Sequence, residues 1–211
     1  NWPNTFRRGR WWEGEPRGYH PNKKYQEQLE KISSFIKNAQ SYGKGSSNSK
    51  NESFVAMQGL FDGSKKLFVH VNGEKEIIDA IHLLKKNGVK ELVLVGAYES
   101  YKVADLIVKN NIPVLVRRVH TIPTNEDHDY DQTFKLPKML VDNGVLVSLQ
   151  SRGQMERKNT RNLPYYAGQV VGQGLVQEVA MQHITLNAAR ILGIDTHYVS
   201  LEKGKSATLF I

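Results

Sequence analysis

From Leu67 to Leu149 the sequence alternates short runs of consecutive apolar residues with stretches that have one apolar face. Strands made of consecutive Val, Leu and Ile are buried on both faces, as in a parallel sheet covered by helices. The predicted strands are Leu67–Val71, Leu92–Val95, Pro113–Val116 and Val145–Leu149. The predicted connecting helices are Glu74–Asn87, Ser100–Asn110 and Phe134–Asn143. This alternation predicts an α/β fold of about four βα units.

The segments before this region have different patterns. Lys24–Tyr42 has apolar side chains at intervals of three and four residues, which predicts an amphipathic helix. Residues 1 to 24 have no helical or strand period, and we expect an irregular segment there, whose tryptophans either pack on the protein or stack with bases or sugars. Gly43–Ser53 is rich in Ser, Gly and Asn, which predicts a mobile surface loop.

Beyond Arg161 the sequence becomes helical in character. The pattern predicts helices at Tyr165–Gln173, Val176–His183 and Thr185–Leu192, and a final strand at Ala207–Ile211. We therefore expect a helical C-terminal part after the α/β region.

Composition limits the classes of function. The 211 residues include 29 Lys and Arg against 21 Asp and Glu, a net charge of +8, and no cysteine. The lack of cysteine removes thiol nucleophiles, disulfides and thiolate metal sites. No apolar run approaches the roughly 20 residues of a membrane-spanning helix, so no membrane partner is expected. The basic excess is scattered and lacks a recognised motif, which disfavours nucleic acid as a partner. Cytoplasm and periplasm both stay open as compartments.

The fold class predicts where a functional site lies. Parallel sheets bind ligands beyond the carboxyl ends of their strands. In this chain the carboxyl ends of the predicted strands lead into residues 70–73, 96–98, 117–120 and 148–153. Arginines near the last of them provide a candidate substrate- or anion-binding site, since guanidinium groups bind carboxylates without a metal. Its candidate residues are Arg152, Arg161 and Asn162.

Four stretches carry a more specific signal. They are Phe61–Gly63 leading into Leu67–Val71, Ile112–Val116 followed by Val119–Pro123, Asn162–Gly168, and Ile184–Gly193 followed by Ser200–Lys205. In this order they resemble the later part of the catalytic barrel in the amidohydrolase superfamily, in its imidazolonepropionase-like branch. The last pair is the most specific, because a helix-opening Thr, a helix-ending Gly and a Leu-Glu-Lys-Gly-Lys turn follow at fixed spacing.

The resemblance implies a partial (β/α) barrel, half of a TIM-like barrel. Residues 61–211 would form this half-barrel and end at the start of the family's small β-sandwich, while residues 1–60 would form the N-terminal segment. The chain would then be a fragment or a degenerate member of the superfamily. It would hydrolyse the C–N bonds of amides or cyclic amides only if a missing N-terminal half supplied the metal site.

The metal ligands of the family are largely absent. In the superfamily, zinc or another divalent metal lowers the pKa of bound water. The ligands come from a His-x-His pair on the first strand, a Lys or carboxylate on the fourth, a His on each of the fifth and sixth, and an Asp on the eighth. His70 matches the fifth-strand His, but Val95–Ala97 and Gln150–Gly153 lack the later two ligands. Because catalytic zinc takes three protein ligands, we expect this chain alone to hold no metal cofactor and to be inactive.

Other candidate residues have two interpretations. His120 is a candidate catalytic or substrate-contacting residue, and His70 a candidate metal ligand; alternatively each is a partly buried histidine that is hydrogen-bonded at a strand end. A run of charged residues in one loop is interpreted as solvated rather than metal-binding. Its members are Asp127, His128, Asp129 and Asp131.

Three hypotheses for function remain. The chain is part of an amidohydrolase with a small-molecule substrate, or a non-catalytic binding or scaffold module descended from one, or a basic nucleic-acid-binding domain. A half-barrel leaves unpaired edges and an apolar face. We therefore expect an open, flavodoxin-like sheet, a homodimer, or association with the missing N-terminal half.

Overall fold

The computed structural model describes residues 3–7, 18–45, 51–123, 128–151 and 160–207. The chain forms two compact units, one of Asn1–Leu67 with Ile78–Glu91 and one of Phe68–Ile77 with Leu92–Ile211.

The first unit contains a strand pair and helices. Its elements are β1 (Asn4–Arg7), β2 (Gly18–Pro21), α1 (Tyr25–Lys44), α2 (Glu52–Met57), α3 (Gly59–Asp62) and most of α4 (Glu74–Lys86). The hydroxyl of Tyr25 on α1 donates a hydrogen bond to Asp79 on α4 at 3.0 Å. The buried amide of Asn87 donates to the hydroxyl of Ser33 at 3.1 Å. These bonds hold α1 against α4, and both helices lie where the sequence predicted them.

The N-terminal segment is more regular than expected. β1 and β2 pair antiparallel, so the prediction of an irregular first segment was wrong for these residues. The two strands are only four residues long, and their pairing spans ten residues that lie outside the described part of the chain, as do all three tryptophans. A stretch this short has no period from which a strand can be inferred.

The predicted Ser/Gly/Asn-rich loop is shortened by α2. The side chain of Asn51 accepts a hydrogen bond from the backbone N–H of Phe54 at 3.2 Å, which starts the helix inside the expected loop. The ring of Phe54 then lies 5.4 Å from Phe35 and 5.7 Å from Tyr42, both on α1. Residues 46–50 lie outside the described residues.

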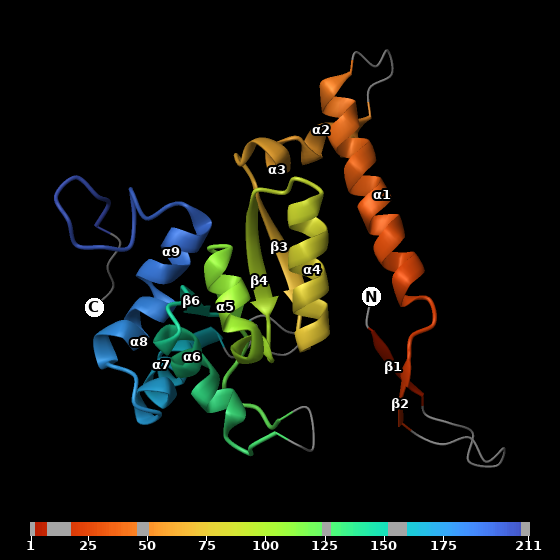
Figure 1. Ribbon diagram of the computed structural model, residues 1–211. Coiled ribbons are helices and arrows are strands. Elements are labelled where there is room, and N and C mark those ends of the chain that lie inside the picture. The colour runs from red at the N-terminus through yellow and green to blue at the C-terminus, as the bar shows by residue number, and fades with distance from the viewer. Residues whose placement is uncertain (1–2, 8–17, 46–50, 124–127, 152–159, 208–211) are drawn as a thin grey trace. The chain divides into compact units, whose positions relative to one another are not determined.

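The second unit is built on a parallel sheet. Its strands are β3 (Lys66–Val71, which enters this unit at Phe68), β4 (Glu91–Gly96), β5 (Val114–Val116) and β6 (Val147–Leu149), in the spatial order β3-β4-β5-β6. Figure 1 shows β3 and β4 side by side. β4, β5 and β6 pair in parallel, and Leu94, Val114 and Val147 share one register position. All three side chains are fully buried. The prediction of an α/β partial barrel with parallel strands is confirmed.

The order of the strands corrects one expectation. A flavodoxin-like sheet reverses its direction of strand addition at a switch point. Here each strand is added beside the preceding one, without reversal, as around the wall of a barrel. The arrangement is therefore a barrel segment and not a flavodoxin-like sheet.

Helices follow the strands of the second unit. They are η2 (Ser100–Val103, a 3₁₀ turn), α5 (Ala104–Lys109), α6 (Gln132–Asp142), α7 (Leu163–Gly172), α8 (Gln177–Ile184) and α9 (Leu186–Leu192). The last three lie together beside β6, which confirms the predicted helical C-terminal part (Figure 1). Most of the predicted strand at Ala207–Ile211 lies outside the described residues.

The outer edge of β6 is covered by a side chain. Leu146 O accepts a hydrogen bond from β5, so the next carbonyl, of Val147, points away from β5. The buried amide of Asn187 on α9 donates to that carbonyl at 2.8 Å. The hydroxyl of Ser148 donates to the carbonyl of His183 on α8 at 2.7 Å. Polar side chains thus fasten the C-terminal helices to the last strand.

Replacing Asn187 with alanine is expected to lower the free energy of unfolding by about 1 to 2 kcal/mol, because a buried carbonyl loses its donor. Urea unfolding measures this loss. The matched control is Asn143→Ala, which removes a similar amide-to-carbonyl bond (to Met139, 2.8 Å) at an exposed helix end. Water replaces that bond, so only a few tenths of a kcal/mol are expected. Equal losses in the two variants would contradict a special role for Asn187.

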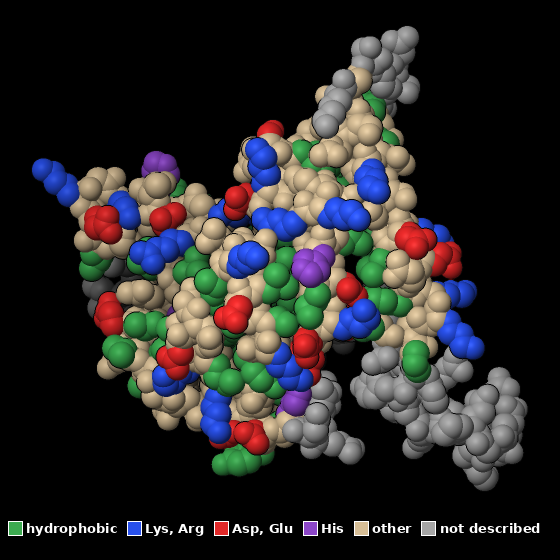
Figure 2. Space-filling model, viewed as in Figure 1, with side chains coloured by type: hydrophobic (Ala, Val, Ile, Leu, Met, Phe, Trp, Pro, Cys, Tyr) green, Lys and Arg blue, Asp and Glu red, His purple; other side chains and the backbone are tan. Residues whose placement is uncertain are grey.

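The surface agrees with the scattered charge of the sequence. On the face shown in Figure 2, Lys and Arg side chains are interspersed with Asp and Glu. Among the helices in the described ranges, none has both the length and the apolarity needed to cross a membrane.

Candidate functional site

The carboxyl ends of the parallel strands form one rim. Gly96, Val116 and Leu149 lie at the same register position, so the residues that follow them emerge side by side. The end of β3 joins this rim because the Ala97 N–H donates to the Val71 carbonyl at 2.6 Å. This is the edge of the sheet that the sequence predicted as the functional one.

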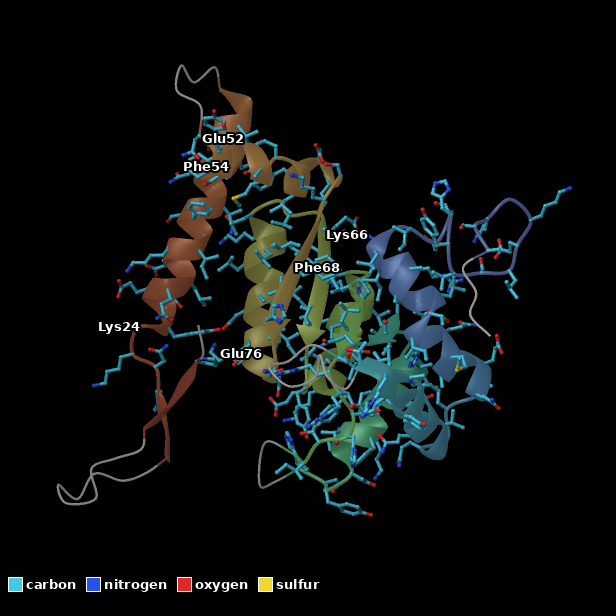
Figure 3. All side chains as sticks on the ribbon, turned by 180° about the vertical axis from the view of Figure 1, so that it is seen from behind. Lys24, Glu52, Phe54, Lys66, Phe68 and Glu76 are labelled. Carbon is cyan, nitrogen blue, oxygen red and sulfur yellow. The ribbon has the colours of Figure 1, made fainter. Side chains whose placement is uncertain are left out.

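A cavity of about 480 Å³, here called the rim cavity, opens at this edge. Residues directly at the strand ends border it: Asn72, Gly96, Tyr98, Val116, Arg117 and Arg118. Glu76, in the first turn of α4 (Figure 3), accepts hydrogen bonds from the backbone N–H of Asn72 at 2.9 Å and of Gly73 at 3.3 Å. This carboxylate fixes the turn that carries Asn72 into the cavity wall.

A second cavity, of about 380 Å³, also has Arg118 in its wall. Besides Arg118 its wall contains His120, Asn162, Tyr165, Tyr166 and Gln169. α7 contributes the two tyrosines and Gln169, while His120 comes from the loop after β5 and its ring lies 5.9 Å from Phe134. Arg118 is therefore the residue that the two cavities share.

The structure brings together some of the sequence-predicted site residues. His120 and Asn162, which are 42 positions apart, line the same cavity. Arg161 is exposed and lines neither cavity, and Arg152 lies outside the described residues. His70 lines neither cavity and is exposed, which corrects the interpretation of a partly buried histidine.

A hydrogen-bonded cluster supports the rim beside Tyr98. One carboxylate oxygen of Glu99 accepts from Lys102 Nζ at 2.8 Å and lies 3.1 Å from His128 Nε2. The other accepts from the backbone N–H of Glu74 at 2.8 Å. The ring of His128 stacks on Tyr98 at 5.4 Å between ring centroids. Glu99 thereby joins the start of α4 to the loop after β4.

Burial and hydrogen bonding act in opposite directions on Glu99. Burial alone would raise the pKa of its carboxyl. The hydrogen bonds from Lys102 and from the Glu74 N–H outweigh burial and hold the pKa below its ordinary value. The carboxylate is therefore ionised in the folded protein at neutral pH.

The loop of charged residues needs a correction. The sequence interpretation made His128 a solvated residue, but its side chain is almost fully buried against Glu99 and Tyr98. Asp131 pairs with Lys135 at 2.8 Å and Asp129 is exposed, while Asp127 lies outside the described residues. The contact between Glu99 and His128 spans 29 positions, and no local pattern indicates it.

Replacing Glu99 with glutamine is expected to destabilise the protein by about 1 kcal/mol at pH 7, because charge-assisted hydrogen bonds become neutral ones. Since the folded pKa is lowered, the parent loses this stability as the pH falls below about 4.5, and the two proteins should converge there. Chemical unfolding between pH 7 and pH 3 measures the difference. Glu178→Gln, at an exposed position on α8, is the control and should follow the parent throughout.

The described residues do not fit the metal site of the resembled family. Gly96 has φ +93°, and a Cβ there would lie 2.6 Å from the Asn72 side chain and 3.0 Å from the Val71 carbonyl. No histidine side chain can therefore occupy the end of β4. Within the described ranges, no three His, Asp or Glu side chains are gathered closely enough to hold a metal ion. His70 stands at the end of β3 without such companions.

These features define a partial (β/α) barrel with ligand-sized cavities at the carboxyl ends of its strands. Comparison with protein-family models finds no match, and comparison with curated proteins finds none. Among solved structures, the fold is similar to that of an amidohydrolase from Thermotoga maritima MSB8, with a TM-score of 0.68 and 22% sequence identity. The match covers 87% of this chain and 47% of that one, so the chain spans about half the length of this relative. At this identity the likeness concerns the fold.

Proposed function

We propose that the chain is an amidohydrolase-related half-barrel of the imidazolonepropionase-like branch. It takes part in hydrolysing C–N bonds of amides or cyclic amides only when another part of the polypeptide supplies the remaining strands and the zinc or other divalent metal site. The observation that carries this proposal is the rim cavity, which lies where (β/α) barrels place their active sites, in a fold similar to half of an amidohydrolase.

The exposed face of β3 supports the need for further strands. β3 is at one end of the sheet, and its Phe68 and His70 side chains are exposed (Phe68 is labelled in Figure 3). An apolar side chain at a sheet edge favours association with another strand or chain. A homodimer and an N-terminal half-barrel are both partners that would cover it.

The test compares this chain with the complete reading frame that contains it. Each is purified, analysed for bound metal, supplied with zinc, and assayed for amine release from N-acyl amino acids and for ring opening of cyclic amides. We expect hydrolysis by the complete protein and none by this chain. Hydrolysis by this chain with stoichiometric metal, or an inactive complete protein that holds a full metal site, would refute the proposal.

A second candidate function is binding without catalysis. Its supporting observation is that the wall residues His120 and Asn162 come together beside Arg118 although the described residues do not fit a metal. A complete protein that binds small acids at these cavities and hydrolyses no amide would favour this candidate.

A further inference from the structure

We propose that the rim cavity is a binding site for a small organic acid, whose carboxylate is held by Arg118 while Arg117 adds positive charge. The site differs from the loop of Arg152 and Arg161 that the sequence suggested. It requires neither a metal nor hydrolysis, so it does not depend on the hydrolysis proposal. It deepens the second candidate function by naming the ligand class and the arginine that would hold it.

The hydrogen-bonding state of Arg118 is the first observation. Its Nε is buried and has no hydrogen-bond acceptor among the described residues. A guanidinium group is always charged and has no acceptor atoms, so a buried N–H without a partner is unfavourable. A carboxylate can accept from Nε–H and from one Nη–H at once, in the side-on bidentate arrangement. Arg118 is one of the residues that line the rim cavity, so its side chain borders the space that such a ligand would occupy.

The charge around the cavity is the second observation. Neither Arg117 nor Arg118 makes an ion pair with another described residue. None of the described residues that line the rim cavity or the second cavity is acidic. Other cations of this unit do have partners, as in the pairs Lys102–Glu99 and Lys138–Asp142. Two adjacent arginines that have no ion pair among the described residues, at a concave site, favour an anion.

The remaining walls define the rest of the ligand. Val116, Leu136 and Pro123 also line the rim cavity and give part of its wall an apolar surface. Its volume of about 480 Å³ is in the ordinary range for small-molecule sites. An inorganic anion would leave this apolar surface uncovered. The chemistry therefore favours a carboxylic acid with an aromatic or branched apolar group.

The test is calorimetric titration of the full chain with phenylacetate and N-acetylphenylalanine, with phenylacetamide as the neutral isostere and phenyl phosphate as the tetrahedral anion. We expect both acids to bind and the amide to bind at least about tenfold more weakly, since it lacks the charge. Arg118→Gln should weaken acid binding by about tenfold or more. Arg118→Lys keeps the charge but loses the planar fork, and should weaken it by about threefold or more.

Arg190→Gln is the matched control, because Arg190 is exposed on α9 and lines neither cavity. It should bind the acids as the parent does. Circular dichroism checks that each variant is folded. If Arg118→Gln does not fold, the comparison of Arg118→Lys with the parent provides the test. The proposal is overturned if neither acid binds the parent, if the amide binds equally, if Arg118 variants bind as the parent does, or if phenyl phosphate binds more tightly than the carboxylates. Such a failure would leave the hydrolysis proposal standing, because no bond is broken in this experiment.

Discussion

Replacing Gly96 with alanine is expected to lower the free energy of unfolding by about 3 kcal/mol. Two effects add at this position. The backbone has φ +93°, which is unfavourable for a residue with a Cβ, and the new methyl group would lie 3.0 Å from the Val71 carbonyl and 2.6 Å from the Asn72 side chain. Asn72 can move, but the carbonyl belongs to β3 and accepts the hydrogen bond from Ala97. The strand end that borders the rim cavity must therefore shift.

Gly144→Ala separates the two effects. Gly144 has φ +82°, but no atom lies within 4 Å of the position of its Cβ. Only the backbone term applies there, so a loss of about 1 kcal/mol is expected. Urea unfolding of the parent and both variants measures the difference. Equal losses would mean that β3 accommodates the methyl group and that a side chain does fit at the end of β4.

A loss of stability between pH 6.5 and pH 4 is the second large effect expected, and its source is His183. The ring is fully buried on α8, and neither ring nitrogen has a hydrogen-bond partner in the described part of the chain. Burial disfavours the charged form and lowers the pKa of His183 from 6.5 to about 4. Between these two pH values the unfolded chain binds a proton that the folded protein does not. Stability therefore falls as the pH falls, by about 3 kcal/mol in total.

The variant His183→Leu should lack this dependence. A leucine fills the same apolar site without a group that titrates. As the pH is lowered from 7.5 to 4, the free energy of unfolding of the parent should therefore fall further than that of the leucine variant. Guanidine unfolding at several pH values gives both curves, and acidic groups such as Glu99 contribute equally to both. His82→Leu, at an exposed position on α4, is the matched control and should follow the parent. Parallel curves for the parent and His183→Leu would show that burial does not lower the pKa of His183 in the folded protein.

The core of the fold was predictable because it rests on local composition. β4 contains Leu92, Val93, Leu94 and Val95 in succession, and all four are buried. The side chains of such a run are all buried only if apolar layers cover both faces of the strand. The run therefore predicts a strand in a parallel sheet covered by helices, and with it the edge at which ligands bind. The segment 117–120 was predicted to lie at the rim, but its arginines were not singled out from the sequence, because the candidate anion site was placed at Arg152 and Arg161.

Features that depend on distant pairings could not be predicted. β1 and β2 form strands by pairing with each other. His128 is buried by its contacts with Glu99 and Tyr98, which are far from it in the sequence. His183 has a polar side chain near the end of a short helix, a position that local pattern assigns to solvent as readily as to the core. In each case the determining partner lies outside any local window of sequence.

The amide of Asn187 makes the two edges of the sheet unequal. It occupies the Val147 carbonyl, a position that an incoming strand would need for its own N–H. A strand from another half-barrel or another copy must displace this side chain to pair with β6, whereas β3 presents an edge with Phe68 exposed. Assembly would therefore begin at β3, and closure at β6 would be the later step.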